Sequence, residues 1–227
     1  MATQLLDRSV DTQLTTGLTI ANVGGDTATY NFATMPGNLP KKYGNTVYIW
    51  QTPTSSVPRN AKPLNHNPVR VDQPDGSDVF SSLQIGNLPY LIAYAVGDSV
   101  SRVCSTAFIP ASGKDFSYVS PGVSRVGIGS TSQTFQYQLP QGMLPGEDGD
   151  WAGLWEGQDT GVLYDKDVKP KRHLQVKSEK HTDQETFTDV VLERGTEYII
   201  GYFKGGFSSS DPDRRGLACS VSWTQEA

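Results

Sequence analysis

The sequence predicts an all-β fold of two tandem β-sandwiches, on three observations. The 227 residues are enough for two domains of ordinary size, each with its own core. Short apolar segments are broken by Gly, Pro, Asn and Asp, and no long stretch repeats apolar residues at helical spacing, a pattern typical of strands and turns. The chain also aligns with itself: residues 30–51 fall on residues 135–156 without a gap.

The self-alignment keeps the residue types that a sandwich needs: aromatic core positions, turn glycines and a Leu-Pro pair. The pairs that carry it are Tyr30 with Phe135, Phe32 with Tyr137, Gly37 with Gly142, Gly44 with Gly149, Ile49 with Leu154 and Trp50 with Trp155. Further along, residues 90–94 fall on 198–202, Phe80 on Phe187, Cys104 on Cys219 and Phe108 on Trp223. A repeat of this length indicates an internal duplication of a domain of about 100 residues. We therefore expect Trp50 and Trp155 to be buried in equivalent strands.

The elements of the first copy follow in order. Strands are expected at residues 14–23, 27–34, 46–51, 69–71, 79–85, 91–96 and 101–109, each ended by turn residues. Residues 52–67 carry several prolines and are expected to form an irregular edge. The predicted first domain spans 10–110, a Ser-, Pro- and Gly-rich linker spans 111–122, and the second domain spans 123–227.

The second copy differs from the first by an insertion at residues 205–215, which predicts a long hairpin between its last two strands. It also carries the charge excess of the chain and a basic run over residues 166–180. That run is typical of a charged edge strand, which resists pairing with other chains, and an anionic partner is the alternative.

Two motifs of the second copy resemble known families. Residues 192–198, Leu-Glu-Arg-Gly-Thr-Glu-Tyr, resemble the corner before strand F of fibronectin type III domains. In immunoglobulin-like sandwiches a Tyr at this corner hydrogen-bonds back to the chain, which implies that role for Tyr198. Asp150-Trp151-Ala152-Gly153-Leu154-Trp155, with residues 198–203, is similar to strands of the SKICH type of immunoglobulin-like domain, whose members are adaptors. The first copy departs from this motif, with Asn45-Thr46 in place of Asp-Trp. The resemblance implies tandem immunoglobulin/fibronectin III-like sandwiches and describes a fold.

Charge and hydropathy exclude several classes. A net charge of −5 and a pI near 5.2 argue against nucleic-acid binding. No apolar run is long enough for a transmembrane segment, and the N-terminus lacks a basic region followed by an apolar one. We therefore expect a cytoplasmic protein, or one released without a recognisable signal peptide. Cys104 and Cys219 are too few for a disulfide framework and are expected to be reduced and buried.

Catalysis and metal binding find little support. The three histidines lie in no recognised motif, and nucleophile elbow, Walker and dinucleotide patterns are absent from the sequence. Asp72, Asp75 and Asp78 recur around Gly76, but Asp-Gly pairs are ordinary turn chemistry, and calcium binding stays open. We expect no enzymatic activity, no cofactor and no dedicated metal site.

The sequence places a candidate ligand site on loops of the second domain. The loop before strand C and the loop between strands F and G lie at the same end of an immunoglobulin-like sandwich. We expect Trp151 either to close the end of the core or to stack on a sugar. The predicted site comprises Glu147, Asp148, Asp150, Trp151, Phe207, Asp211, Asp213, Arg214 and Arg215. The predicted function is a non-enzymatic binding or assembly protein with a protein or glycan partner. A lectin-like protein is the alternative, and a homo-oligomer is left open.

Overall fold

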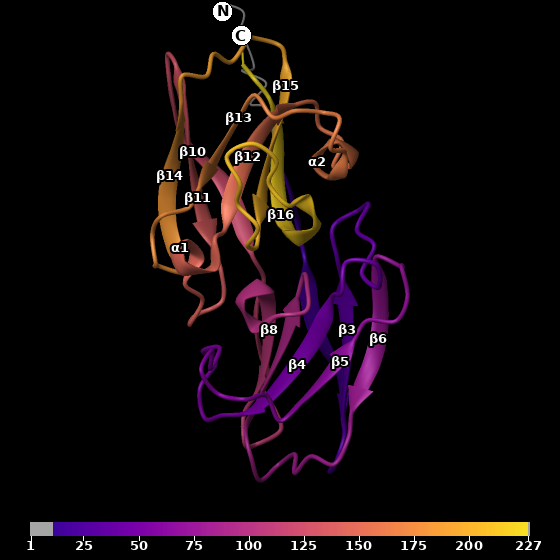
Figure 1. Cartoon of the computed structure of the whole chain (residues 1–227). Coiled ribbons are helices and arrows are strands. Elements are labelled where there is room, and N and C mark those ends of the chain that lie inside the picture. The colour runs from indigo at the N-terminus through magenta and orange to yellow at the C-terminus, as the bar shows by residue number, and fades with distance from the viewer. Residues whose placement is uncertain (1–10, 227) are drawn as a thin grey trace, which may run out of the picture.

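The protein forms two β-sandwiches, each made of a three-stranded and a five-stranded antiparallel sheet (Figure 1). The computed structural model describes residues 11–226. In the first sandwich, one sheet has the order β2-β3-β6 and the other β5-β4-β7-β8-β9. Their bounds are β2 Gly17–Val23, β3 Ala28–Ala33, β4 Thr46–Gln51, β5 Asn65–Pro68, β6 Asp75–Phe80, β7 Tyr90–Ala95, β8 Val103–Ile109 and β9 Ser117–Val119.

The second sandwich repeats this arrangement with sheets of order β10-β11-β14 and β1-β16-β15-β12-β13. Its strands are β1 Thr12–Thr15, β10 Gly122–Gly129, β11 Ser132–Gln138, β12 Trp151–Glu156, β13 Arg172–Gln175, β14 Thr182–Thr188, β15 Glu197–Phe203 and β16 Leu217–Thr224. Tandem immunoglobulin/fibronectin III-like sandwiches are thus the fold of this chain, as the sequence predicts.

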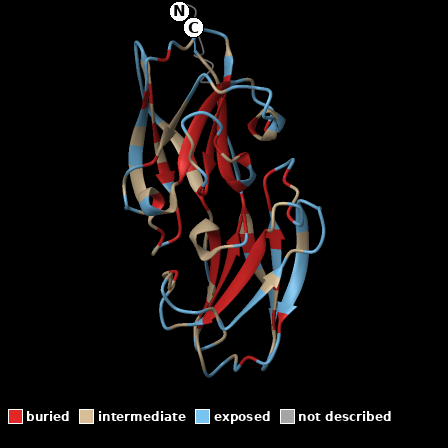
Figure 2. Cartoon of the chain, viewed as in Figure 1, coloured by how far each residue is buried: buried red, intermediate tan, exposed pale blue. Residues whose placement is uncertain are grey.

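Burial follows the expected strand patterns. β3 alternates buried and accessible residues, with Tyr30 and Phe32 facing the core, so this outer strand is solvated on one face. By contrast, β4, β7, β12 and β15 are buried on both faces (Figure 2). Loops cover the outer faces of their sheets, so Trp50 and Trp155 are buried beneath those loops rather than between the two sheets of a sandwich.

The two sandwiches exchange strands. β1 precedes the first sandwich but pairs with β16 of the second, with Leu14 opposite Ser220. β9 precedes the second sandwich but pairs with β8 of the first, with Tyr118 opposite Ala107. The expected single strand over 14–23 therefore divides at Thr16, whose amide donates to the Ala218 carbonyl at 3.0 Å. Part of the expected linker, residues 117–119, is likewise strand, because each crossing segment covers an otherwise open edge of β8 or β16.

The hydrogen-bond registers of the two sandwiches coincide. Thr46 lies opposite Ala95, as Trp151 lies opposite Phe203, so β4 and β12 are equivalent along their whole lengths, and Trp50 corresponds to Trp155. The bulges repeat as well: one follows Ile20 in β2 and its equivalent follows Arg125 in β10. The two sandwiches therefore correspond strand by strand.

The pairing of the last two strands in each sandwich shifts the self-alignment by one residue in this region. Tyr94 pairs with Ser105, and Tyr202 pairs with Cys219. Ser105 is therefore the equivalent of Cys219, and the match of Cys104 to Cys219 is wrong by one position. The match of Phe108 to Trp223 fails for the same reason, since the insertion before β16 left the register undetermined by sequence alone.

Two other strand predictions differ from the structure. The short strand expected at 69–71 is instead β5 at 65–68, which begins inside the segment 52–67 that was expected to be irregular. The strand expected at 79–85 begins earlier, because β6 spans Asp75–Phe80 and pairs with β3 through polar residues at an exposed edge. The pattern of apolar residues in the sequence did not reveal these two strands, since neither strand buries a continuous face.

A tyrosine corner occurs in both sandwiches. The Tyr198 hydroxyl accepts a hydrogen bond from the Glu193 amide at 2.8 Å, which confirms the role that the fibronectin resemblance implies. The Tyr90 hydroxyl accepts from the Gln84 amide at 2.9 Å in the same way. In each sandwich, one buried tyrosine hydroxyl thus holds the crossover before the sixth strand.

The contact between the sandwiches is built from equivalent loops. The Val57 amide, in the loop after β4, donates to the Gln141 carbonyl of the second sandwich at 2.8 Å. Gly142 has φ +90°, and a Cβ there would lie 2.5 Å from the Val57 carbonyl oxygen. Gly37, its equivalent, has φ +86° and lies against the Tyr164 ring of the second sandwich. Glycine is required at both points for conformation and for close approach.

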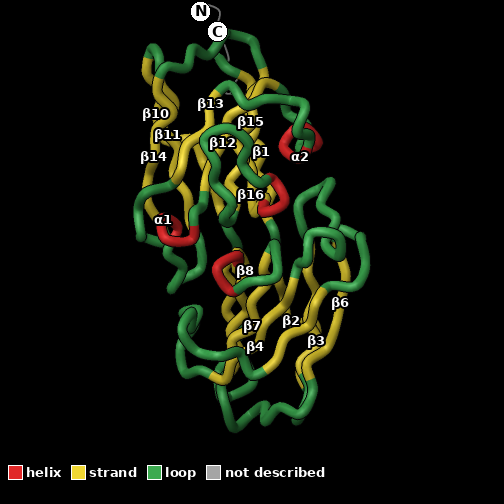
Figure 3. Tube along the Cα trace, viewed as in Figure 1, coloured by secondary structure: helices red, strands yellow, loops and turns green. Residues whose placement is uncertain are grey.

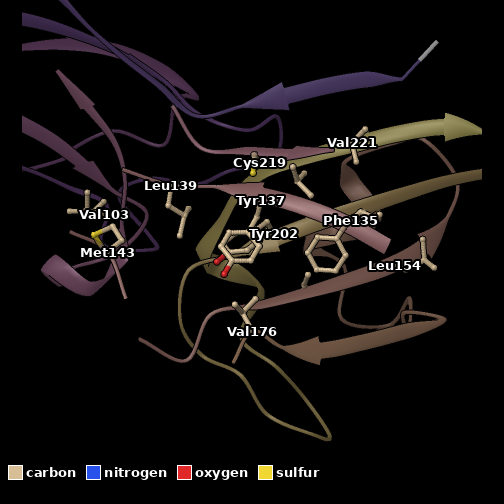
Figure 4. Packing of buried hydrophobic residues seen from close by; sticks show 14 of the residues in the cluster. Val103, Phe135, Tyr137, Leu139, Met143, Leu154, Val176, Tyr202, Cys219 and Val221 are labelled. Atoms are coloured by element: carbon tan, nitrogen blue, oxygen red, sulfur yellow. The ribbon is translucent and has the colours of Figure 1, made fainter. Parts of the chain in front are cut away.

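Buried apolar side chains run across this contact. Val103 of the first sandwich belongs to one continuous cluster with Met143, Leu139 and Tyr202 of the second (Figure 4). The helical segments are short and lie in loops: α1 Pro145–Asp148, α2 Gly161–Tyr164 and the 3-10 turns Val100–Arg102 and Arg214–Gly216 (Figure 3). No helix within residues 11–226 is long and apolar enough to cross a membrane.

Candidate functional site

The two loops of the predicted site meet, as expected, at one end of the second sandwich. The Phe207 amide donates to the Gly149 carbonyl at 3.1 Å, which joins the insertion to the acidic loop. The same end faces the first sandwich, because Arg59 and Arg102 reach it from there. Much of the predicted rim is therefore engaged within the chain.

Asp150 lies at the centre of this region and is fully buried. Its carboxylate accepts from the Lys204 ammonium at 2.5 Å, the Tyr202 hydroxyl at 3.0 Å and the Gly205 amide at 2.8 Å. The Lys204 side chain is also fully buried. Burial raises the pKa of Asp150 above its ordinary value, while Lys204 and the Gly205 amide favour the charged form. Asp150 is thus part of an internal ion pair and is inaccessible to a ligand.

Two further acidic residues of the predicted site bind arginines of the first sandwich. Asp148, whose side chain is 2% exposed, accepts from Arg59 at 2.7 Å. Asp213 accepts from Arg102 at 3.1 Å and from Arg215 at 2.8 Å. Burial alone would raise the pKa of Asp213, but hydrogen bonds from Arg215 and Arg102 prevail and lower it to about 2. These carboxylates hold the two sandwiches together.

The aromatic and basic members are also packed internally. Trp151 is fully buried, and its ring stacks on Phe203 with centroids 3.9 Å apart and planes 5° apart. The Trp151 indole N–H donates to the Asp213 carbonyl at 3.2 Å. The Arg214 guanidinium lies over the Trp155 ring at 5.3 Å and donates to the Asp165 carbonyl. Trp151 therefore packs on the outer face of the sheet, and not at the end of the core where the sequence led us to expect it.

Three predicted residues have mostly exposed side chains: Glu147 at 65%, Asp211 at 55% and Arg215 at 58%. Phe207 is half-buried against His173, with ring centroids 6.1 Å apart. Asp213 raises the pKa of Arg215 by hydrogen bonding and charge, with a smaller contribution from Asp98 of the first sandwich. Asp98 in turn borders a region that the sequence did not single out.

That region is an open groove on the outer face of β4 and β5 in the first sandwich, with a cavity volume of about 550 Å³. We call it the β4–β5 groove. It is lined by Gly44, Thr46, Tyr48, Lys62, Pro63, His66, Pro68, Asp98, Ser99 and Val100, and its lining is mostly apolar. Three loops border it: the end of the loop before β4, the segment before β5 and the turn between β7 and β8.

The floor of the β4–β5 groove is held in place. Tyr48 and His66 lie opposite each other in the paired strands, with ring centroids 6.1 Å apart. The Tyr48 hydroxyl donates to the Asp98 carbonyl at 2.7 Å, which ties the floor to the β7–β8 turn. Trp50, next along the same face, donates to the Ala61 carbonyl at 3.0 Å and secures the segment that carries Lys62. The aromatic surface is therefore preorganised.

Sequence reasoning missed this groove, although a signal was present. Lys62-Pro63-Leu64-Asn65-His66 recurs as Lys169-Pro170-Lys171-Arg172-His173, and the strand registers make His66 and His173 equivalent. The repeated Lys-Pro and His mark the same surface in both sandwiches. Irregular composition hid the strand that carries His66.

The remaining chemistry of the described residues is limited. Among residues 11–226 no three His, Cys, Asp or Glu side chains lie close enough to hold a metal ion. Cys104 and Cys219 are free and buried, and burial raises the pKa of Cys104 to about 12. Neither thiol is placed as an activated nucleophile.

Comparisons with known proteins add little to this description. No protein-family model matches the chain, and no curated protein does. Among solved structures, the FN1–FN3 domains of chicken CNTN1 align over 92% of this chain at 13% identity and a TM-score of 0.29. The aligned region spans 64% of that chain's length. The fold assignment therefore rests on strand order and register, which define a tandem immunoglobulin/fibronectin III-like sandwich protein.

Proposed function

We propose that the protein is a non-enzymatic binding protein and that the β4–β5 groove is its ligand site. The main observation behind this proposal is a preorganised concave surface that no other part of the described chain fills. Its volume of about 550 Å³ falls in the range of small-ligand and side-chain pockets, roughly 300–1,000 Å³. Its mostly apolar floor and few polar groups at the rim are the usual composition of such pockets.

The exposed part of the predicted rim forms a second, separate candidate surface. Glu147, Asp211 and Arg215 remain accessible. Both surfaces suit a role in binding or assembly, with a protein as the first candidate partner.

A lectin-like function is the second candidate. The observation in its favour is the pair of rings of Tyr48 and His66 beside the exposed Lys62 and Asp98. Aromatic faces flanked by polar groups can stack on a sugar ring while hydrogen-bonding its hydroxyls. Tyr48 contributes little to such bonding, because its hydroxyl already donates to the Asp98 carbonyl.

We also infer that the two sandwiches arose by internal duplication. Coincident registers and bulges, two tyrosine corners and the shared Lys-Pro and His positions support this origin. Divergence at the same surface then left the first sandwich with the β4–β5 groove.

The test pairs a displayed-peptide library with a glycan array, each screened with wild type and with a Lys62→Ala/His66→Ala variant. Both residues are exposed, so the variant is expected to keep the melting temperature of wild type. We expect ligands that bind wild type and lose at least tenfold in affinity for the variant. A Glu147→Ala/Arg215→Ala variant, matched in number of changes, tests the rim. If the selected ligands bind the Lys62→Ala/His66→Ala variant as tightly as wild type, the groove is not the site.

A further inference from the structure

The second sandwich contains the same groove position, already filled. β12, β13 and β15 stand in the registers of β4, β5 and β7, so Trp151 takes the place of Thr46, Phe203 that of Ala95 and His173 that of His66. One chain therefore presents the same surface twice, once occupied and once open.

The occupant in the second sandwich is an aromatic ring. Trp151 lies flat on Phe203 and presents its edge to His173, with centroids 6.2 Å apart and planes 81° apart. Phe207, from the insertion, lies on the other side of His173. Asp213 accepts the indole N–H through its backbone carbonyl, so the polar atom of the ring is satisfied.

The first sandwich lacks these fillers. Thr46 and Ala95 are far smaller than Trp151 and Phe203, and the turn between β7 and β8 is shorter than the insertion-bearing loop between β15 and β16. Among residues 11–226, the β7–β8 turn contributes Asp98, Ser99 and Val100 to the groove, and none of these is aromatic like Phe207. Tyr48 stands where Gly153 lies in the second sandwich, and it forms part of the groove floor, held by its bond to Asp98.

We infer that the β4–β5 groove accepts an aromatic side chain, tryptophan above all, presented by a peptide segment of a protein partner. The inference rests on the proposed function and names the class of its ligand. The ring would lie over Thr46 and against the exposed His66, as Trp151 lies on Phe203 and beside His173.

An aromatic side chain fits this lining better than a sugar does. The Tyr48 hydroxyl already donates to the Asp98 carbonyl, so it is not free to donate to a sugar hydroxyl. Transfer of an aromatic ring from water into a mostly apolar pocket is favourable without many hydrogen bonds, whereas buried sugar hydroxyls each need a partner.

The experiment titrates N-acetyl-L-tryptophanamide into the ¹⁵N-labelled full chain and follows amide chemical shifts. Shifts are expected at Thr46, His66 and Val100, saturable and at least tenfold weaker with N-acetyl-L-alaninamide. Methyl α-D-mannopyranoside and methyl β-D-galactopyranoside are titrated in parallel. Shifts at the groove with a sugar but not with the indole probe would overturn this inference and leave the proposed function standing. No shift at the groove with any probe would overturn the inference as well, and the library screens would then decide the proposed function by themselves.

Two variants sharpen the result. Thr46→Trp copies the filler of the second sandwich and is expected to remove the response to the indole probe. If Thr46→Trp does not fold, His66→Ala serves instead, since His66 is exposed, and at least a threefold loss of affinity is expected. Unchanged affinity in a folded Thr46→Trp protein or in His66→Ala would overturn the inference.

Discussion

The two sandwiches have the same backbone fold but differ in charge at one equivalent buried place. In the first, Asn45 accepts from the Tyr94 hydroxyl at 2.9 Å and from the Asn38 amide at 2.8 Å, and Val96 lies nearby in the core. In the second, Asp150 accepts from Tyr202 and is paired with Lys204. The registers of β7 and β15 make Val96 and Lys204 equivalent, so one fold accommodates a neutral network and an ion pair at the same place.

The Asp150–Lys204 ion pair in the core of the second sandwich also contributes to the contact with the first sandwich. Lys204 also lies 3.6 Å from Asp148, which in turn binds Arg59 of the first sandwich. The charged network thus runs from the second core to the other sandwich. The neutral version in the first sandwich shows that folding as such does not require the charges.

The largest effect is expected when this pair is broken on one side. Lys204→Val leaves the Asp150 carboxylate buried without its cation and should lower the free energy of unfolding by about 3–5 kcal/mol. The double variant Asp150→Asn/Lys204→Val reproduces Asn45 and Val96 of the first sandwich and should cost far less. Urea denaturation of both variants measures the difference. A double variant as unstable as the single one would show that the two core positions are not interchangeable.

A second substitution converts the filled groove into the open one. Trp151→Thr copies Thr46 and removes a fully buried ring stacked on Phe203, so we expect a loss of about 3 kcal/mol from cavity formation. The same variant should gain a response to N-acetyl-L-tryptophanamide at His173. Thermal and urea unfolding measure the loss of stability, and amide chemical shifts measure the response to the indole probe at His173. A loss below about 1 kcal/mol would mean that the ring contributes little to packing.

The two arginines that cross between the sandwiches differ in the burial of their partners. Arg59→Ala leaves Asp148, only 2% exposed, with a single distant cation, and should cost about 1.5–3 kcal/mol. Arg102→Ala leaves Asp213 paired with Arg215 and should cost about 1 kcal/mol or less. Denaturation of the two variants side by side tests the order. The reverse order would contradict the assignment of Asp148 as the more dependent carboxylate.

The smallest effect is a dependence on pH. The pKa of Asp213 falls from 3.8 to about 2 in the folded protein, so its charged form is stabilised by folding. This contribution is fully present above about pH 4 and is lost as the pH falls through the folded pKa near 2. The stability difference between wild type and Asp213→Asn should therefore shrink between pH 4 and pH 2. A difference that grows towards acid would have the wrong sign.

Sequence alone determined the strand-forming segments that bury apolar residues, and the repeat that relates them. β4 matches its expected bounds, and the loops of the predicted site meet as sandwich topology requires. These features are local or periodic, since alternation, turn glycines and aromatic spacing are set within a few residues. The same patterns could not find β5, which buries no face of its own.

Only the tertiary structure decided what those segments contact. Thr12–Thr15 and Ser117–Val119 pair across the sandwiches, since an edge strand accepts any extended segment and sequence does not say which. Asp150 and Trp151 looked like loop residues for a ligand and are buried because Lys204 and Phe203 approach them from another strand. The β4–β5 groove likewise is lined by residues such as Tyr48 and His66 that meet only when β4 and β5 pair. Residues far apart in the chain decide both outcomes, because the residues on the neighbouring strand determine whether a side chain is buried and whether a groove stays open.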